Sequence, residues 1–282
     1  MVPARPGPTP SCSDVELLTL ALAREFLERR SERAWRAEVL ADWQHLVPRV
    51  PKQSQWNRRV RWRWGAFEHL RAFWLRPFPI APGGWEATDT APLPIRHPSR
   101  VRPPTGPCSC DWAGSGPVDG PPGLAAHFGY GAALDRGGFG FRLALRSGLT
   151  AGLIRGWGIV PAAVDERPVA EGVLAGEHAI NLLPDQGFRS APGDRCWAAE
   201  QDIRHLLAPS RQERAAHTRP PVVDAFVGAF RNRIEATNDT RKARFHLEQH
   251  LAKAFWGLLT RGASKIAAAT CAKLWPLGLS PV

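Results

Sequence analysis

The chain has few lysines, almost no methionine and no long apolar segment. Only five of its 37 basic residues are lysines, and it contains a single methionine. Such an arginine bias suits bidentate contacts with phosphate, although a GC-rich genome would produce the same bias. No apolar run approaches the roughly 18 residues of a membrane span, and residues 1–10 lack the apolar stretch of a signal peptide. The sequence therefore predicts a soluble, intracellular protein.

Cysteine is scarce and irregularly spaced. The five cysteines are Cys12, Cys108, Cys110, Cys196 and Cys271. An odd, scattered set argues against a disulfide framework and fits a reducing cytoplasm. Cys108 and Cys110 have no second Cys or His pair close by, which disfavours a zinc site. We expect free thiols.

Acidic residues are outnumbered. The 282 residues include 37 Lys and Arg against 26 Asp and Glu, which gives a net charge of +11. A hydrophobic content of 44% is enough for a sizeable core and excludes a wholly disordered basic tail. The length fits one large domain, or a core with a small accessory domain. A soluble protein of this charge most often has a nucleic acid as its partner.

The N-terminal part predicts a small helical domain. Residues 1–12 are expected to form a disordered leader, because four of the first ten are prolines. Ser13 and Glu16 form a capping box before an apolar run, which indicates a helix of roughly four turns. Further helical stretches at about 31–46 and 54–75 complete a domain over residues 13–76.

The third of these stretches interleaves basic and aromatic side chains. Its basic residues are Arg58, Arg59, Arg61 and Arg63, and its aromatic residues are Trp56, Trp62 and Trp64. Such a helix can lie against DNA phosphates. The alternative is a surface helix whose tryptophans pack on the first two helices while its arginines face water. The spacing does not decide between the two.

Residues 77–275 predict an α/β domain with a mixed sheet. Strands are expected at about 85–93, 139–145, 153–160, 179–183 and 203–207. Helices are expected at about 168–174, 222–239 and 246–274. Residues 103–123 are dense in Pro, Gly and Ser and predict a long loop. Residues 276–282 are expected to form a tail.

Three carboxylates occupy positions that suggest chemistry. Asp89 lies inside the first predicted strand, Asp185 directly follows the apolar run that ends at Leu183, and Glu235 lies in a helical segment among cations. Carboxylates on three separate elements can hold two Mg²⁺ or Mn²⁺ ions. Two such ions about 4 Å apart activate a water or a 3′ hydroxyl for attack on a phosphodiester.

The order of several short motifs resembles the DDE transposases of bacterial insertion sequences, which have an RNase H-like catalytic fold. These motifs are Thr88-Asp89-Thr90, the strand at 139–145, Asp165-Glu166-Arg167, the stretch 182–188 around Asp185, and Arg231-x3-Glu235-x6-Lys242. The resemblance covers roughly residues 14–275, and the spacing around Glu235 is its most specific part.

The resemblance implies an RNase H-like catalytic core and a function in transposition. Asp89, Asp185 and Glu235 would be the catalytic, metal-ligating residues, and Arg231 and Lys242 would bind the DNA backbone. The activity implied is metal-dependent cleavage and strand transfer at insertion-sequence ends, with two Mg²⁺ or Mn²⁺ ions. The partners would be terminal inverted repeats and target DNA, and a homodimer would form the synaptic complex. The protein would work in the bacterial cytoplasm, at the nucleoid.

Helical spacing gives an argument independent of the family. Arg231 and Glu235 are four residues apart, and Lys242 follows about two turns later, so all three share one helix face. An ordinary solvated face with an ion pair would show the same spacing. Asp165 is the rival for the second aspartate, because it also follows a predicted strand.

The sequence departs from the family pattern at three places. The family's tyrosine three residues before the arginine falls here at Gly228, so stacking would have to come from Phe226 or Phe230. Pro184 precedes Asp185 and removes a backbone amide. The loop at 103–123 replaces a shorter connection. Two alternatives follow, a decayed remnant that only binds DNA and an RNase H-like nuclease without strand transfer.

Overall fold

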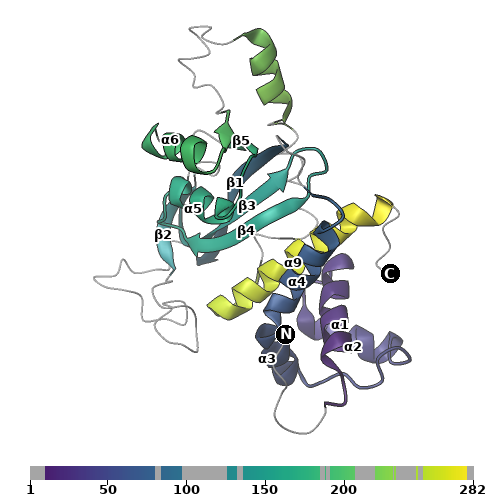
Figure 1. Ribbon diagram of the computed structural model, residues 1–282. Helices are drawn as coiled ribbons and strands as arrows, with labels where there is room; N and C mark the ends of the chain where they lie inside the picture. The colour runs from purple at the N-terminus through teal and green to yellow at the C-terminus, as the bar shows by residue number, and fades with distance from the viewer. Residues whose placement is uncertain are drawn as a thin grey trace.

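The computed structural model describes residues 10–79, 84–96, 126–131, 136–184, 188, 191–206, 220–230, 232, 246 and 250–277. It shows a mixed α/β fold in which helices cover both faces of one sheet (Figure 1). The predicted loop at 103–123 lies outside these ranges. So do most of the leader and the last five residues of the tail.

Four helices form the N-terminal part: α1 (Asp14–Phe26), α2 (Glu32–Asp42), α3 (Gln53–Trp62) and α4 (Trp64–Leu75). The predicted capping box at α1 is confirmed. The Glu16 amide donates to Ser13 Oγ at 3.1 Å, and the Ser13 amide donates to Glu16 Oε2 at 2.6 Å. Cys12, which the sequence placed in the leader, is buried.

The predicted helix at 54–75 is in fact two helices that meet at Arg63. Arg63 has φ −106° and ψ 17°, and its amide bonds back to Arg59 and Val60 as a C-cap. The turn lets Trp56 of α3 and Phe67 of α4 enter the same apolar core. The sequence pattern did not reveal this turn, because both helices carry tryptophans and arginines.

Within the described residues, six strands form one sheet: β1 (Trp85–Arg96), β2 (His127–Gly131), β3 (Arg136–Gly148), β4 (Ile154–Pro161), β5 (Asn181–Pro184) and β6 (Arg204–His205). The order is β2-β3-β1-β5-β6, and β4 pairs with the part of β3 that β2 leaves open. Strand β3 runs antiparallel to both β1 and β4, whereas β5 and β6 run parallel to β1. The predicted mixed sheet is confirmed, and its order is compatible with an RNase H-like fold.

Strand β2 and one helix were not predicted. β2 reads His127-Phe-Gly-Tyr-Gly, a glycine-rich run, and its Phe128 ring packs against Phe139 of β3. Gly129 lies so close to the backbone of Ala162 that a Cβ would collide with it. Here tertiary packing decides the strand. The missed helix is α6 (Ala191–Glu200), whose sequence begins with Ala-Pro-Gly.

The remaining helices are α5 (Glu166–Leu174), residues 221–230 and α9 (Phe255–Leu274), which continues into the 3₁₀ turn η4 (Trp275–Leu277). The prediction that the last helix starts at 246 is wrong. His246 and Leu251 have positive φ values of 46° and 51°, which no α-helix accommodates. The helix starts only at Phe255.

Helix α9 lies between the sheet and the N-terminal helices (Figure 1). Ile266 and Ala269 join the apolar core on the sheet, whereas Ala263 and Ala267 join the core of α1 to α4. Small residues let it approach both layers. The boundary expected near residue 76 stays a prediction, but α9 contributes side chains on both sides of it. No described helix has the length and apolarity needed to span a membrane.

Candidate active site on the central strand

Asp89 lies in β1, the central strand of the sheet. Side chains alternate along a strand, so Asp89 shares a face with Ala87 and Ala91. The apolar core that includes Ala91 and Leu143 covers this face together with α9. The Asp89 side chain is half-buried, and its Oδ1 accepts the amide of Thr90 at 2.8 Å. A carboxylate therefore interrupts an otherwise apolar strand face.

Strand β5 ends beside this point. Its register on β1 pairs Ala87 with Leu183 and Thr88 with Pro184. Ala87 and Leu183 share an apolar cluster with Val227 from the helix at 221–230. The same side of the sheet thus carries the middle of β1, the end of β5 and a C-terminal helix.

The opposite face of β1 carries a different polar group. Thr90 Oγ1 donates to Glu166 Oε1 at 3.1 Å, and Arg142 pairs with the same oxygen at 3.3 Å. Glu166 opens α5, and Asp165 is the exposed N-cap of that helix. Asp165 therefore belongs to the helix that covers the face away from Asp89, which weakens it as a partner for that carboxylate.

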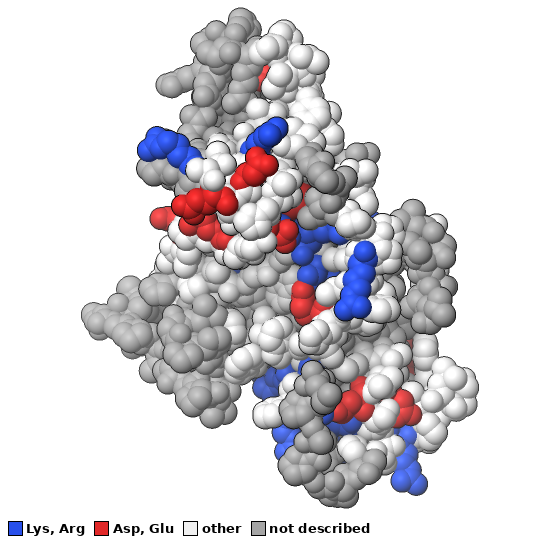
Figure 2. Space-filling view, in the orientation of Figure 1, with Lys and Arg blue, Asp and Glu red and all other residues white. Residues whose placement is uncertain are grey.

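Acidic side chains gather over α5 on the face of the molecule shown in Figure 2. This region would repel a polyanion, so it is a poor surface for DNA.

Four of the residues predicted for the catalytic site and its DNA contacts lie outside the described residues. They are Asp185, Arg231, Glu235 and Lys242. Within the described ranges, no three metal-binding side chains come together.

The helix at 221–230 contains Gly228, the position that corresponds to a tyrosine in the family that the sequence resembles. Gly228 is exposed, with nothing within 4 Å of an added Cβ. Phe226 packs against Trp85 at a ring distance of 5.1 Å and against Phe230 at 4.4 Å. Both phenylalanines pack on the apolar cluster around Ala87. They anchor the helix to the sheet, so neither presents a free stacking surface like the tyrosine.

The four arginines of the basic and aromatic stretch divide into two pairs. Arg59 donates to Asp14 Oδ1 at 2.6 Å and to the Cys12 oxygen at 2.8 Å, and Arg63 donates to Asp14 Oδ2 at 2.9 Å. Partial burial would raise the pKa of Asp14, but the hydrogen bonds from both arginines outweigh it and hold that pKa below its ordinary value. Arg59 and Arg63 therefore fasten α3 to α1.

Arg58 and Arg61 face solvent instead, and so does Trp62, whose exposed fraction is 77%. The packing interpretation therefore holds for only part of the helix, and contact with DNA stays a prediction. Trp56 is buried among the helices, as the packing interpretation expects. The outer row keeps the basic and aromatic character expected of a nucleic-acid surface.

Sequence reasoning missed a buried ion pair on the face of β1 opposite Asp89. Glu86 is 1% exposed, and its Oε2 lies 3.4 Å from Arg146 Nη1. Arg146 also bonds Glu177 at 2.5 Å. Burial raises the pKa of Glu86 despite the adjacent arginine. The alternation in Trp85-Glu86-Ala87 was the available signal, since it places Glu86 on the face opposite Asp89.

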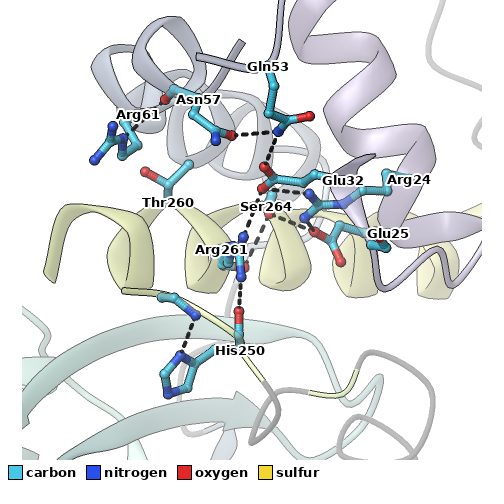
Figure 3. A network of polar contacts seen from close by, with 12 residues as sticks. Arg24, Glu25, Glu32, Gln53, Asn57, Arg61, His250, Thr260, Arg261 and Ser264 are labelled. Atoms are coloured by element: carbon cyan, nitrogen blue, oxygen red, sulfur yellow. Dashed lines mark hydrogen bonds and ion pairs between the residues drawn. The ribbon is translucent and has the colours of Figure 1, made fainter. Parts of the chain in front are cut away.

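A second network joins the N-terminal helices to α9 (Figure 3). Glu32 Oε1 accepts from Arg24 at 2.8 Å and from Arg261 at 3.1 Å. Arg261 also donates to the backbone oxygen of His250. These residues come from α1, α2, α9 and the segment before α9, so the network fixes how the helices meet.

No protein-family profile matches the sequence, and no curated protein matches it. Among solved structures, the chain is similar to one from the crystal structure of a pre-cleavage Mos1 transpososome, with 11% sequence identity. The match covers 96% of this chain and 81% of that chain, with a TM-score of 0.23. A score this low supports no conclusion about fold or activity, so the site is judged on its own residues.

Proposed function

We propose that the chain is a DDE-type DNA transposase that cleaves and joins insertion-sequence ends. Asp89, Asp185 and Glu235 would form its catalytic site on an RNase H-like core. The observation that supports this best is the parallel register between β1 and β5. That register brings the sequence neighbours of two of the three carboxylates side by side.

The last described pair of this register is Thr88 with Pro184. Asp89 and Asp185 are the next residues on the two segments. If the register continued by one residue, the two aspartates would lie opposite each other, at the roughly 4.8 Å spacing of neighbouring strands. Ala87 and Leu183 share a face, so the same alternation would direct both carboxylates toward the side that holds Val227.

The third carboxylate is argued from helical spacing. Val223 and Val227 pack on the cluster around Ala87. Arg231 and Glu235 continue this row in steps of four, so a helix extended to them carries both on the side of the two aspartates. Lys242 follows Glu235 by seven residues. This spacing supports a basic residue on each side of Glu235, where a DNA backbone would pass.

The residues fit a divalent cation. Asp89 is a half-buried carboxylate on a rigid central strand, and hard oxygen ligands of this kind suit Mg²⁺ or Mn²⁺. Asp89, Asp185 and Glu235 would hold two such ions, which supply Lewis acidity toward the phosphodiester. The chain's own contribution is to fix the carboxylates and to bind the DNA through Arg231 and Lys242. Terminal inverted repeats and target DNA would be the partners, and a homodimer would pair the two ends.

The test is a strand-cleavage assay with Mg²⁺ or Mn²⁺ on DNA that carries the inverted repeats flanking the gene. Asp89→Asn, Asp185→Asn and Glu235→Gln should each abolish cleavage and joining. Asp165→Asn and the exposed Asp42→Asn serve as controls and should retain both activities. Equal cleavage by wild type and by the first three variants would overturn the assignment. Loss of cleavage in Asp165→Asn with activity in Asp185→Asn would give the second position to Asp165.

A DNA-binding remnant without activity is the second candidate. It is favoured by exposed Gly228 at the tyrosine position and by the inward packing of Phe226. A remnant would bind the ends with a steep salt dependence but would show no metal-dependent cleavage. Cleavage without joining would instead indicate an RNase H-like nuclease.

A further inference from the structure

A pocket opens between α3 and the start of α9. Its volume is about 300 Å³. Asn57 and Arg61 of α3 line one side, and Lys253 and Gly257 line the other. Figure 3 shows Arg61 and Asn57 on one helix, above Thr260 of α9. The pocket thus lies between the N-terminal helices and the last helix.

Two cations of this pocket have no carboxylate partner within the described part of the chain. Arg61 Nε donates to the backbone oxygen of Asn57 at 3.2 Å, and no described residue bonds the two terminal amino groups of the guanidinium. Lys253 is exposed and forms no ion pair with a described residue. A planar guanidinium and a compact ammonium together suit the tetrahedral oxygens of a phosphate.

The acidic residue on the pocket wall does not cancel this charge. Glu32 Oε1 is paired with Arg24 and Arg261, and its Oε2 accepts from Gln53 Nε2 at 3.1 Å. Burial would raise the pKa of Glu32, but the charges and hydrogen bonds of Arg24 and Arg261 outweigh burial and hold that pKa below its ordinary value. Among the described residues, no carboxylate is paired with Arg61 or Lys253.

The start of α9 adds to the positive electrostatic potential of the pocket. Its N-cap is Ala254, which has no side chain to accept the first amides, and its first turn contains no acidic residue. A 20-residue helix therefore directs an uncapped, partly positive end toward the wall formed by Ala254 and Gly257. Thr260 offers the pocket no hydrogen-bond donor, because its Oγ1 already donates to the backbone oxygen of Trp256 at 2.6 Å.

We propose that this pocket binds a phosphate group through Arg61 and Lys253, and that in the nucleoprotein complex the group is a DNA backbone phosphate. Trp62 and Arg58 lie exposed on the same helix, so a strand held in the pocket passes a basic and aromatic row. The DNA half of the proposal rests on the proposed function, whereas the phosphate half does not.

The experiment compares Arg61→Gln and Lys253→Gln with two charge-matched controls. Arg33→Gln and Lys273→Gln remove one exposed positive charge each from α2 and from the far end of α9. Binding of a fluorescent DNA duplex is titrated from low to high KCl by anisotropy. In a second arm, protection from thermal unfolding is measured with inorganic phosphate at constant ionic strength.

Each pocket variant should weaken DNA binding several-fold and reduce the magnitude of the salt slope by about one, while the controls change neither quantity by as much. Loss of phosphate protection in the pocket variants alone would show that free phosphate also enters the site. A DNA effect without a phosphate effect assigns the pocket to the backbone. The proposal is overturned if the pocket variants match their controls in both arms. The phosphate arm uses no DNA and no cleavage, so failure of the catalytic assignment remains distinguishable from failure of this one.

Discussion

The imidazole Nε2 of His250 lies 3.1 Å from the backbone oxygen of Pro94, which ties the segment before α9 to the central strand. The other ring nitrogen, Nδ1, accepts the amide of Ala252 at 3.1 Å. This pair of bonds requires the neutral ring with its proton on Nε2. Protonation of Nδ1 would remove the acceptor that Ala252 needs.

This geometry predicts an acid-sensitive fold. Burial lowers the pKa of His250 from 6.5 to about 4. The unfolded chain therefore binds the proton first, and stability should fall as the pH drops from 6.5 toward 4. The loss should be at most about 3 kcal/mol. Chemical denaturation at pH 7 and pH 5 measures it.

His250→Gln provides the comparison, because glutamine offers a donor and an acceptor but does not titrate. The variant should be less stable at pH 7 and should show a weaker dependence on pH. The exposed His45→Gln is the control and should follow wild type. An unchanged pH dependence in His250→Gln would assign the acid sensitivity to another group.

Asp14→Ala should destabilise the N-terminal helices. The substitution leaves the buried guanidinium of Arg59 without its carboxylate, at a cost of about 2 kcal/mol once the partial exposure of Asp14 is considered. Because the native pKa of Asp14 is lowered, this stabilisation is present above its ordinary value of 3.8 and is lost as the pH falls through the native pKa. Asp42→Ala, at the exposed end of α2, should change stability little. Urea titrations at pH 7 and pH 3 check both statements.

Two glycines of β3 should respond oppositely to alanine. A Cβ on Gly140 would collide with the backbone oxygen of Leu93 and approach Ile95 N to 3.0 Å, whereas a Cβ on Gly138 meets nothing within 4 Å. Gly140→Ala should cost about 2 to 3 kcal/mol, because the backbone of β1 has to move. Gly138→Ala should be neutral or stabilising by up to about 1 kcal/mol. Equal melting temperatures for the two variants would contradict the close approach of β3 and β1.

Lys242 and Arg231 should separate DNA binding from chemistry. Neither cation can hold Mg²⁺, so Lys242→Ala and Arg231→Ala should weaken binding to the element end and reduce the salt slope by about one each. Glu235→Gln should abolish cleavage while binding persists or tightens, since a negative charge leaves the DNA-facing side. DNA binding measured by anisotropy across a KCl series, with cleavage measured in parallel, tests both expectations. Wild-type behaviour of Lys242→Ala would mean that this segment does not face DNA.

Local patterns predicted most elements whose faces alternate cleanly. The strand around Phe139 and Phe141 has a period of two, and Ser13 with Glu16 marks the start of α1, so both follow from neighbouring residues. Neighbouring residues do not predict three other features, which are the turn at Arg63, the strand at Phe128 and the late start of α9. Each depends on a distant contact, such as Arg63 with Asp14 or Phe128 with Phe139.

The site divides in the same way. A carboxylate at Asp89 is conspicuous in an apolar strand, so the sequence alone identifies it as a candidate. The pairing of Thr88 with Pro184 is a register between strands about a hundred residues apart, and no local pattern specifies it. The engagement of Arg59 by Asp14 and the solvent exposure of Arg61 depend likewise on how α3 meets α1.

The position of α9 has a consequence for synthesis of the chain. The side chains of Ala263 and Ala267 complete the core of α1 to α4, which are made much earlier, whereas Ile266 completes the core on the sheet. Neither layer can close until the ribosome has passed residue 267. The N-terminal helices therefore keep apolar surface exposed until α9 has been made. Such long-range closure slows folding, and it makes the docking of α9 the step that completes both layers.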